Sequence, residues 1–134
     1  MDGVAVIKQL LVEHAPLLAL VPADKIYVGT VPLGVFPAVG IREVDRNEFR
    51  TVSMDTESVM IRARIQVTVY AKKYPLQKGL ILAAKLGRGP HTGIIADVLV
   101  KSVERLSVGP DFVDDAAVVY EQSRDFMVTY IEPN

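Results

Sequence analysis

Hydrophobic and polar residues alternate over a long stretch in the middle of the chain. From Val59 to Tyr70 the odd positions are apolar, whereas the even positions include Arg62 and Arg64. Alternation with a period of two is typical of an antiparallel strand that has one face on a core. We therefore predict a strand over residues 59–70, with Arg62 and Arg64 side by side on its polar face.

Two other segments repeat their apolar residues every three to four positions, which is typical of amphipathic helices. The first runs from Val4 to His14, and Pro16 ends or restarts it. The second begins near Pro75 and presents Leu76, Leu80, Ala83 and Ala84 on one side, with Gly87 as a natural stop. We expect both helices to pack on the sheet.

Shorter apolar runs fill the rest of the chain. We predict strands over residues 25–31 and 37–44, and Pro37 fits only the start or the edge of a strand. Residues 94–108 fit either a helical turn or a strand, and we favour a strand from about Val98. A last long strand is expected over residues 117–131. The order of elements predicts one α+β domain over residues 1–134, with an antiparallel sheet of four to five strands flanked by two helices.

A densely charged segment interrupts this pattern at residues 42–58. It contains Arg42, Glu43, Asp45, Arg46, Glu48, Arg50, Asp55 and Glu57. Such a run of charge is typical of a solvated segment, so we predict the exposed tip of a hairpin or a mobile loop.

Composition limits the chemistry that the chain can perform. The 134 residues include no Cys, which excludes disulfide frameworks, thiolate zinc sites, iron–sulfur clusters and Cys nucleophiles. The balance of 15 basic and 16 acidic side chains argues against a protein that neutralises many phosphates. We find no pattern of a signal peptide and predict no membrane span. Half of the residues are hydrophobic, so we expect some apolar surface to be buried against partners.

The two histidines have simple interpretations. His14 lies on the apolar stripe of the first helix, which favours a core or edge histidine. His91 follows Arg88 in the loop 87–93, whose glycines resemble a phosphate cradle. That loop lacks the Lys-Ser/Thr of a P-loop, and Pro90 removes one amide donor, so we favour an ordinary connection.

The carboxylates of Asp111, Asp114 and Asp115 are oxygen ligands of the kind that hard cations prefer. Their spacing is not that of an EF-hand, and a solvated acidic turn is the favoured interpretation. We therefore predict no catalytic residue, no cofactor and no metal site.

Arg62 and Arg64, with Lys72 and Lys73 just beyond the predicted strand, form a candidate basic stripe. Such a stripe contacts DNA phosphates or an acidic partner. The alternative is cross-strand pairing with carboxylates such as Glu121 or Asp125. The balanced net charge favours the alternative.

The order of short segments along the whole chain carries a resemblance. The segments are Val4–Leu11, Pro16–Val21, Lys25–Tyr27, Phe36–Val39, Ile65–Ala71 leading directly into a helix, and Tyr120–Val128. This layout resembles the tail-completion, or tail-terminator, proteins of long-tailed bacteriophages and prophages.

The resemblance implies an α+β subunit that assembles into a ring, typically a hexamer. Such a ring caps the tail tube, ends its polymerisation and joins the tail to the head, in a virion assembled in the bacterial host cytoplasm. The implied partners are other copies of the chain, the major tail-tube protein and a head-completion or connector protein, with DNA only in passage. By position, Arg46, Glu48 and Arg50 are candidate protein contacts, and Arg62 and Arg64 are candidate channel or DNA-facing residues. The resemblance implies no catalytic residue and no cofactor.

Three alternatives stay open at this point. The first is a neck, head-completion or minor tail protein of the same system. The second is a small ligand-binding or enzymatic domain that uses Arg88, His91 and the acidic turn. The third is a DNA-binding module that uses the basic stripe.

Overall fold

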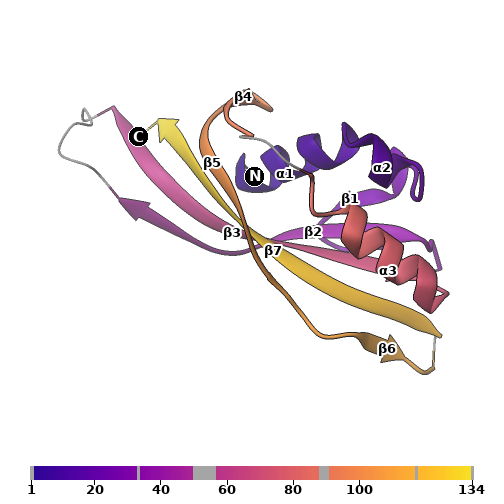
Figure 1. The fold of residues 1–134 in the computed structure, drawn as a ribbon. Coiled ribbons are helices and arrows are strands. Elements are labelled where there is room, and N and C mark those ends of the chain that lie inside the picture. The colour runs from indigo at the N-terminus through magenta and orange to yellow at the C-terminus, as the bar shows by residue number, and fades with distance from the viewer. Residues whose placement is uncertain (1, 33, 50–56, 88–90, 117, 134) are drawn as a thin grey trace.

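One strongly curved sheet dominates the molecule, and all helices lie on one side of it (Figure 1). The computed structural model describes residues 2–32, 34–49, 57–87, 91–116 and 118–133. The helices are α1 (Asp2–Val12), α2 (Ala15–Leu18) and α3 (Tyr74–Ala83), with a 3-10 turn at Ala23–Lys25. We call the side of the sheet that carries them the helix face and the other side the open face.

Seven strands form the sheet: β1 (Ile26–Val28), β2 (Ala38–Phe49), β3 (Ser58–Ala71), β4 (Gly93–Ile95), β5 (Val98–Val108), β6 (Phe112–Asp114) and β7 (Val119–Pro133). Their spatial order is β1-β2-β3-β7-β5-β4, and β6 pairs with the start of β7. Every pair is antiparallel except β1 with β2, which is parallel.

The predicted fold class is therefore wrong. An antiparallel sheet of four to five strands flanked by two helices is replaced by a mixed, curled sheet of seven strands with few helices. β4 and β6 have three residues each, too few to show an alternating pattern. The parallel pairing of β1 depends on how the chain crosses over from Val28 to Ala38, which hydrophobic periodicity does not encode.

The alternating strand predicted around residues 59–70 is confirmed as β3, which lies at the centre of the sheet. Its odd residues from Val59 to Ala71 are buried on the helix face, where they join α1 and α3 in the core. Gly3 marks the closest approach of α1, because a Cβ there would lie 3.1 Å from Ile65 Cδ1. Packing of these helices on β3 and β7 buries one half of the sheet.

The other half of the sheet extends past the helices (Figure 1). In β2, residues 38–41 are buried, whereas nearly all residues from Arg42 to Phe49 are exposed. Residues 42–49 of the charged segment thus form strand, paired with β3 through a bulge between Glu43 and Asp45. A strand that no helix covers can carry charged side chains on both faces, because both faces contact water. Residues 50–56, where we predicted the tip of a hairpin or a mobile loop, lie outside the described residues.

Gly40 gives a direct test of how tightly the segment that follows β1 packs on β2. A Cβ at this position would lie 2.8 Å from Val31 Cγ2, which is closer than two non-bonded carbon atoms approach each other. We expect Gly40→Ala to lower the free energy of unfolding by about 1–3 kcal/mol in chemical denaturation, because the neighbours must shift.

Gly79 provides the matched control for that substitution. It lies inside α3, and a Cβ there would meet only Leu20 Cδ1, at 3.5 Å. Gly79→Ala should leave stability unchanged or raise it by up to about 1 kcal/mol, because alanine favours helix. Equal losses for the two variants would contradict this account of Gly40.

Candidate protein-contact surfaces

Two edges of the sheet lack a neighbouring strand over most of their length. β1 covers only Val39–Ile41 of β2, so the edge of β2 over residues 42–49 is open. On its other side from β7, β5 is covered by β4 only at Val98–Val100, so in the described part of the chain no strand covers the outer edge of residues 101–108. Open edges present unpaired backbone groups to which another chain can add a strand.

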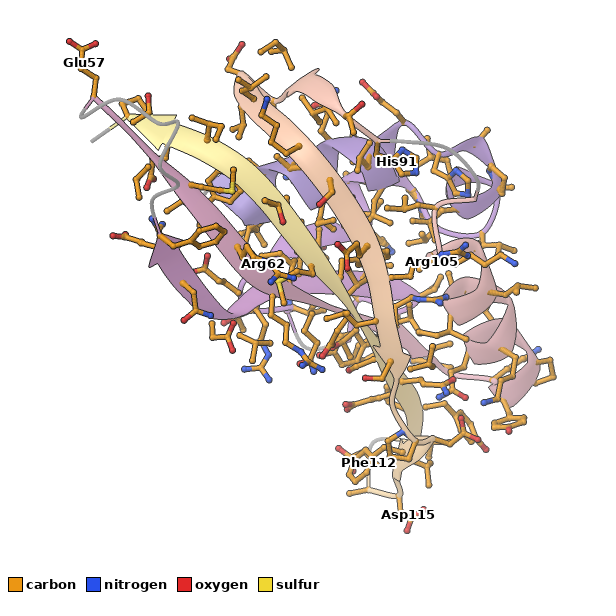
Figure 2. All side chains as sticks on the ribbon, turned by 60° about the vertical axis from the view of Figure 1, so that its left-hand side comes forward. Glu57, Arg62, His91, Arg105, Phe112 and Asp115 are labelled. Carbon is orange, nitrogen blue, oxygen red and sulfur yellow. The ribbon has the colours of Figure 1, made fainter. Side chains whose placement is uncertain are left out.

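Large apolar side chains are exposed close to both edges and at the turn that leads into the start of β7. The exposed side chains are Val44 and Phe49 on β2, Ile94 and Leu99 on β4 and β5, and Phe112, Val113 and Val118 around the turn between β6 and β7. Figure 2 shows Phe112 at the extremity of the molecule. The expected surplus of apolar surface therefore exists, and exposed patches of this kind mark interaction sites.

The candidate contact residues Arg46 and Glu48 lie on β2, on the helix face but beyond the helices. Arg46 Nη2 donates to Glu132 Oε2 at 2.6 Å and to Glu48 Oε1 at 3.1 Å. The hydrogen bond to Glu132 is the main reason that the pKa of Arg46 is raised. Arg46 is thus held inside its own subunit, whereas the Glu48 side chain is 60% exposed. Arg50 lies outside the described residues.

The other two candidates, Arg62 and Arg64, lie on the open face as the alternation predicts. Arg64 Nε donates to Asp125 Oδ2 at 2.7 Å, which is the cross-strand pairing considered above. Arg62 is exposed. The structure therefore leaves Arg62 more accessible than Arg64 as a candidate channel or DNA-facing residue.

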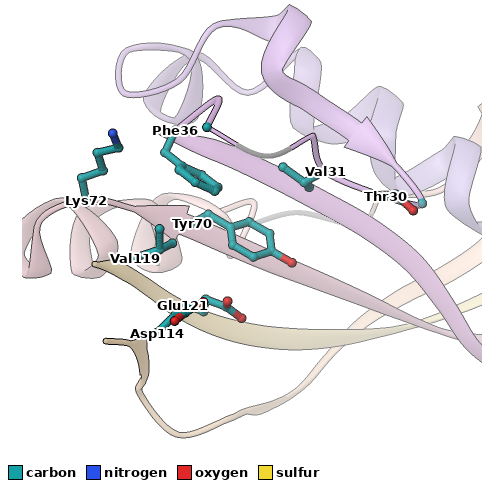
Figure 3. A pocket seen from close by; sticks show the side chains of 10 residues that line it. Thr30, Val31, Phe36, Tyr70, Lys72, Asp114, Val119 and Glu121 are labelled. Carbon is teal, nitrogen blue, oxygen red and sulfur yellow. The ribbon is translucent and has the colours of Figure 1, made fainter. Parts of the chain in front are cut away.

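A hollow of about 540 Å³ lies at the other end of the open face, between the segment that links β1 to β2, the end of β3, and β6 with the start of β7 (Figure 3). The rings of Phe36 and Tyr70 lie 5.9 Å apart on one side of it. Burial raises the pKa of Glu121, and the charge of Asp114 raises it further. Lys72 is also in the lining. This part of the predicted basic stripe is therefore next to carboxylates and does not continue the row of arginines.

Two carboxylates of the acidic turn, Asp111 and Asp114, accept hydrogen bonds within the fold. The Tyr74 hydroxyl donates to Asp111 Oδ2 at 2.8 Å, and Lys78 Nζ also donates to this carboxylate. The hydrogen bond from Lys78, followed by that from Tyr74, lowers the pKa of Asp111. These contacts tie the start of β6 to α3. Asp114 Oδ1 accepts a hydrogen bond from the amide of Ala116.

Among the described residues, no group of three or more His, Cys, Asp or Glu side chains could hold a metal ion. In the same part of the chain, no helix is long and apolar enough to cross a membrane. His14 is half-buried and lies against Gly87, with 3.6 Å between its Cε1 and an added Cβ. His91 lies apart from the acidic turn, next to Lys85 and Arg105 in a separate hollow. The proposed combination of His91 with the acidic turn is not assembled.

Two features of these surfaces were not predicted from the sequence. Phe112 and Val113 are apolar residues within a run of turn-forming and acidic residues, and that contrast is a usable signal for an exposed contact. The proximity of His91 to Arg105 could not be predicted from the sequence, because the two residues are far apart along the chain.

Comparisons with known proteins identify the fold. No protein-family model and no curated protein matches the chain. Among solved structures, it is similar to a chain of the virion of a native gene transfer agent particle, with a TM-score of 0.66 and 16% sequence identity. The match covers 98% of this chain and 97% of that chain. From end to end, the chain therefore shares its fold with a protein of that virion.

Proposed function

We propose that the chain is a structural protein of a phage-like virion, which caps the tail tube as a ring, ends its polymerisation and takes part in joining the tail to the head. The observation that carries the proposal is the end-to-end similarity to a chain of a gene transfer agent virion. The segment order that resembles the tail-terminator family supports the finer assignment.

The surfaces of the molecule support a role in assembly. Two open edges on one sheet suit a head-to-tail contact between identical subunits, the type of contact that closes into a ring. The exposed apolar residues near these edges and around the turn between β6 and β7 are surface that such contacts bury. We propose assembly and not catalysis as the function, with other copies of the chain, the major tail-tube protein and a head connector as partners.

DNA passage through the ring is part of this proposal, and tight DNA binding is not. Arg64 is paired with Asp125, and Arg42 Nε donates to Gln66 Oε1 at 2.9 Å, so two of the three arginines described on this face already have partners, and Arg62 is exposed. A channel with few free cations allows DNA to pass without holding it.

The test is to mix the purified protein with preformed tail tubes and then add more tail-tube subunits. We expect rings at the tube ends in negative-stain images, and tubes that no longer lengthen. A protein that stays monomeric at high concentration and also fails to bind tubes would remove the proposal.

A neck, head-completion or minor tail protein is the remaining candidate within the same system. Parallel pull-downs with the tail-tube protein and with the head connector separate these roles. Retention by the connector alone would favour the neck protein.

A further inference from the structure

A second hollow, of about 240 Å³, lies on the helix face between β5 and the segment that follows α3. Its lining includes the cationic or titratable side chains of Lys85, His91 and Arg105, and the apolar side chains of Leu86, Val103 and Phe126. Figure 2 shows Arg105 on the same side of the sheet as His91, and Arg62 on the other side. We call this hollow the basic pocket.

The basic pocket lacks a counter-ion. No carboxylate is in its lining, and within the described chain Lys85, His91 and Arg105 take part in no ion pair. His91 Nε2 is buried without a hydrogen-bond partner. Buried polar groups are normally satisfied, so this nitrogen points to a group that completes the pocket.

A further arginine lies beside the pocket. Arg124 is only 9% exposed, and its Nη1 donates to the backbone oxygen of Ile81 at 2.6 Å, whereas its Nε has no partner. Burial lowers the pKa of Arg124, and the charge of Arg105 lowers it further. The repulsion between these two arginines shows that an anion at the pocket would stabilise the cluster.

The opposite edge of the same sheet carries a suitable anion. On β2, Glu48 pairs with the buried Ile61 of β3, so its side chain lies on the helix face, as Arg105 does opposite Phe126. Glu48 is on the regular part of β2, whereas Glu43 borders the bulge. The third charged residue on this face, Arg46, donates to Glu132 at 2.6 Å and to Glu48 at 3.1 Å. Glu48 accepts the longer of these two contacts and its side chain is 60% exposed, so it is the carboxylate on this face that can exchange Arg46 for a partner on another copy.

Strand direction permits the two edges to meet. Each step from β2 through β3 and β7 to β5 is antiparallel, so β2 and β5 run in opposite directions. If a second copy continues the sheet in the same orientation, its β2 lies antiparallel to β5 of the first copy. Paired residues in such a sheet share a face, and long side chains also reach their diagonal neighbours.

We propose that the β2 edge of one copy adds to the β5 edge of the next, and that the Glu48 carboxylate then occupies the basic pocket between Arg105, His91 and Lys85. This inference rests on the proposed ring, because it names the contact between its subunits. The contact is heterologous, so repetition of it closes a ring or continues as a filament.

The absence of Cys allows a cross-linking test that leaves the charge pair intact. Phe49→Cys and Ser102→Cys place reporters on the open face of the two edges. We expect a short bis-maleimide to join a tagged Phe49→Cys chain to an untagged Ser102→Cys chain at least about tenfold faster than to a Leu82→Cys chain, because pairing raises the effective concentration. Leu82 is exposed on α3, away from both edges.

Charge substitutions then test the occupant of the pocket. Glu48→Arg in one reporter chain, or Arg105→Glu in the other, should return cross-linking to the Leu82→Cys background, and the two together should restore it. Asp45→Arg is the matched control, because Asp45 lies on the same strand but on the open face, and it should change the rate by less than about twofold.

Three results would overturn the inference. They are a reporter rate equal to the background, a charge swap that fails to restore the rate, and an Arg105→Glu variant whose cross-linking rate is unchanged. A protein that fails to cap tubes but shows the charge-swap pattern would remove the proposed function and leave this contact standing. A protein that caps tubes but lacks the charge-swap pattern would remove this contact and leave the proposed function standing.

Discussion

Replacement of Phe126 by alanine should lower the free energy of unfolding by about 3–5 kcal/mol, the range found for large aromatic side chains in well-packed cores. Phe126 is completely buried in the middle of β7, where it pairs with Ile65 on β3 and with Arg105 on β5. A small domain is stabilised by only about 5–15 kcal/mol, so this loss is a large part of the total.

Two features place Phe126→Ala at the upper end of that range. The ring adjoins the basic pocket, so the atoms on that side cannot collapse into the space that the ring leaves. The strands on both sides are paired over most of their length, which limits how far the backbone can move.

Phe112 supplies the matched control for this prediction, since its side chain is 60% exposed on β6. Phe112→Ala should change the free energy of unfolding by no more than about 0.5 kcal/mol. Chemical denaturation of both variants measures the difference. Similar losses would show that the core is not where the structure places it.

Sequence periodicity predicted the parts of the fold that bury one face. The alternation around residues 59–70 gave β3 almost residue for residue, since its odd positions all point into the core. The second helix was expected from Pro75 and the apolar stripe, and α3 begins one residue earlier, at Tyr74. In each case one face meets the core and the other meets solvent, so the period is visible in the sequence.

The charged half of β2 could not be predicted in the same way. Residues from Arg42 to Phe49 are strand because they pair with β3, and not because they bury a face. A strand whose two faces are both exposed to solvent shows no alternation of apolar and polar residues. Its many charged residues then suggest a loop. The hairpin of β2 and β3 extends beyond the helices. Its open β2 edge is available to pair with a strand of another chain.

For the candidate site residues too, only part of the arrangement could be predicted from the sequence. Arg62 and Arg64 were placed on one face correctly, because a strand fixes which positions share a face. The sequence could not show that Arg64 is paired with Asp125, because this depends on the register between β3 and β7. The basic pocket needs β5, β7 and the segment after α3 together, so it emerges only from the fold.

The arrangement of the two open edges explains why so much apolar and charged surface can coexist on a small sheet. The β2 edge carries exposed Glu48 and Val44, and the β5 edge carries Arg105 in the lining of the basic pocket. Each edge alone is an aggregation risk. The complementary charges of Glu48 and Arg105 favour contact between the β2 edge and the β5 edge, because charge complementarity selects the partner.

The second large effect is expected from Gln77→Glu, which should destabilise the fold by roughly 3 kcal/mol at neutral pH. Gln77 on α3 is completely buried, and its Nε2 donates to the backbone oxygen of Glu121 at 2.6 Å. A glutamate of the same shape would place a carboxylate, with no proton to donate, against that carbonyl oxygen. Burial disfavours the charged form, so the pKa of the introduced carboxyl would be raised in the folded state.

The dependence of that loss on pH identifies its cause. Because the folded-state pKa would lie above the unfolded value, the lost stability should be regained as the pH falls toward the unfolded pKa of about 4.3. It should be lost again as the pH rises through the folded pKa, since only the protonated carboxyl can donate to the Glu121 oxygen. Gln66→Glu is the control: Gln66 Oε1 accepts from Arg42 Nε at 2.9 Å, and a carboxylate keeps that bond. Denaturation curves collected between about pH 4 and pH 8 should therefore diverge for Gln77→Glu and stay near wild type for Gln66→Glu. A constant offset at every pH would mean that shape, and not buried charge, causes the loss.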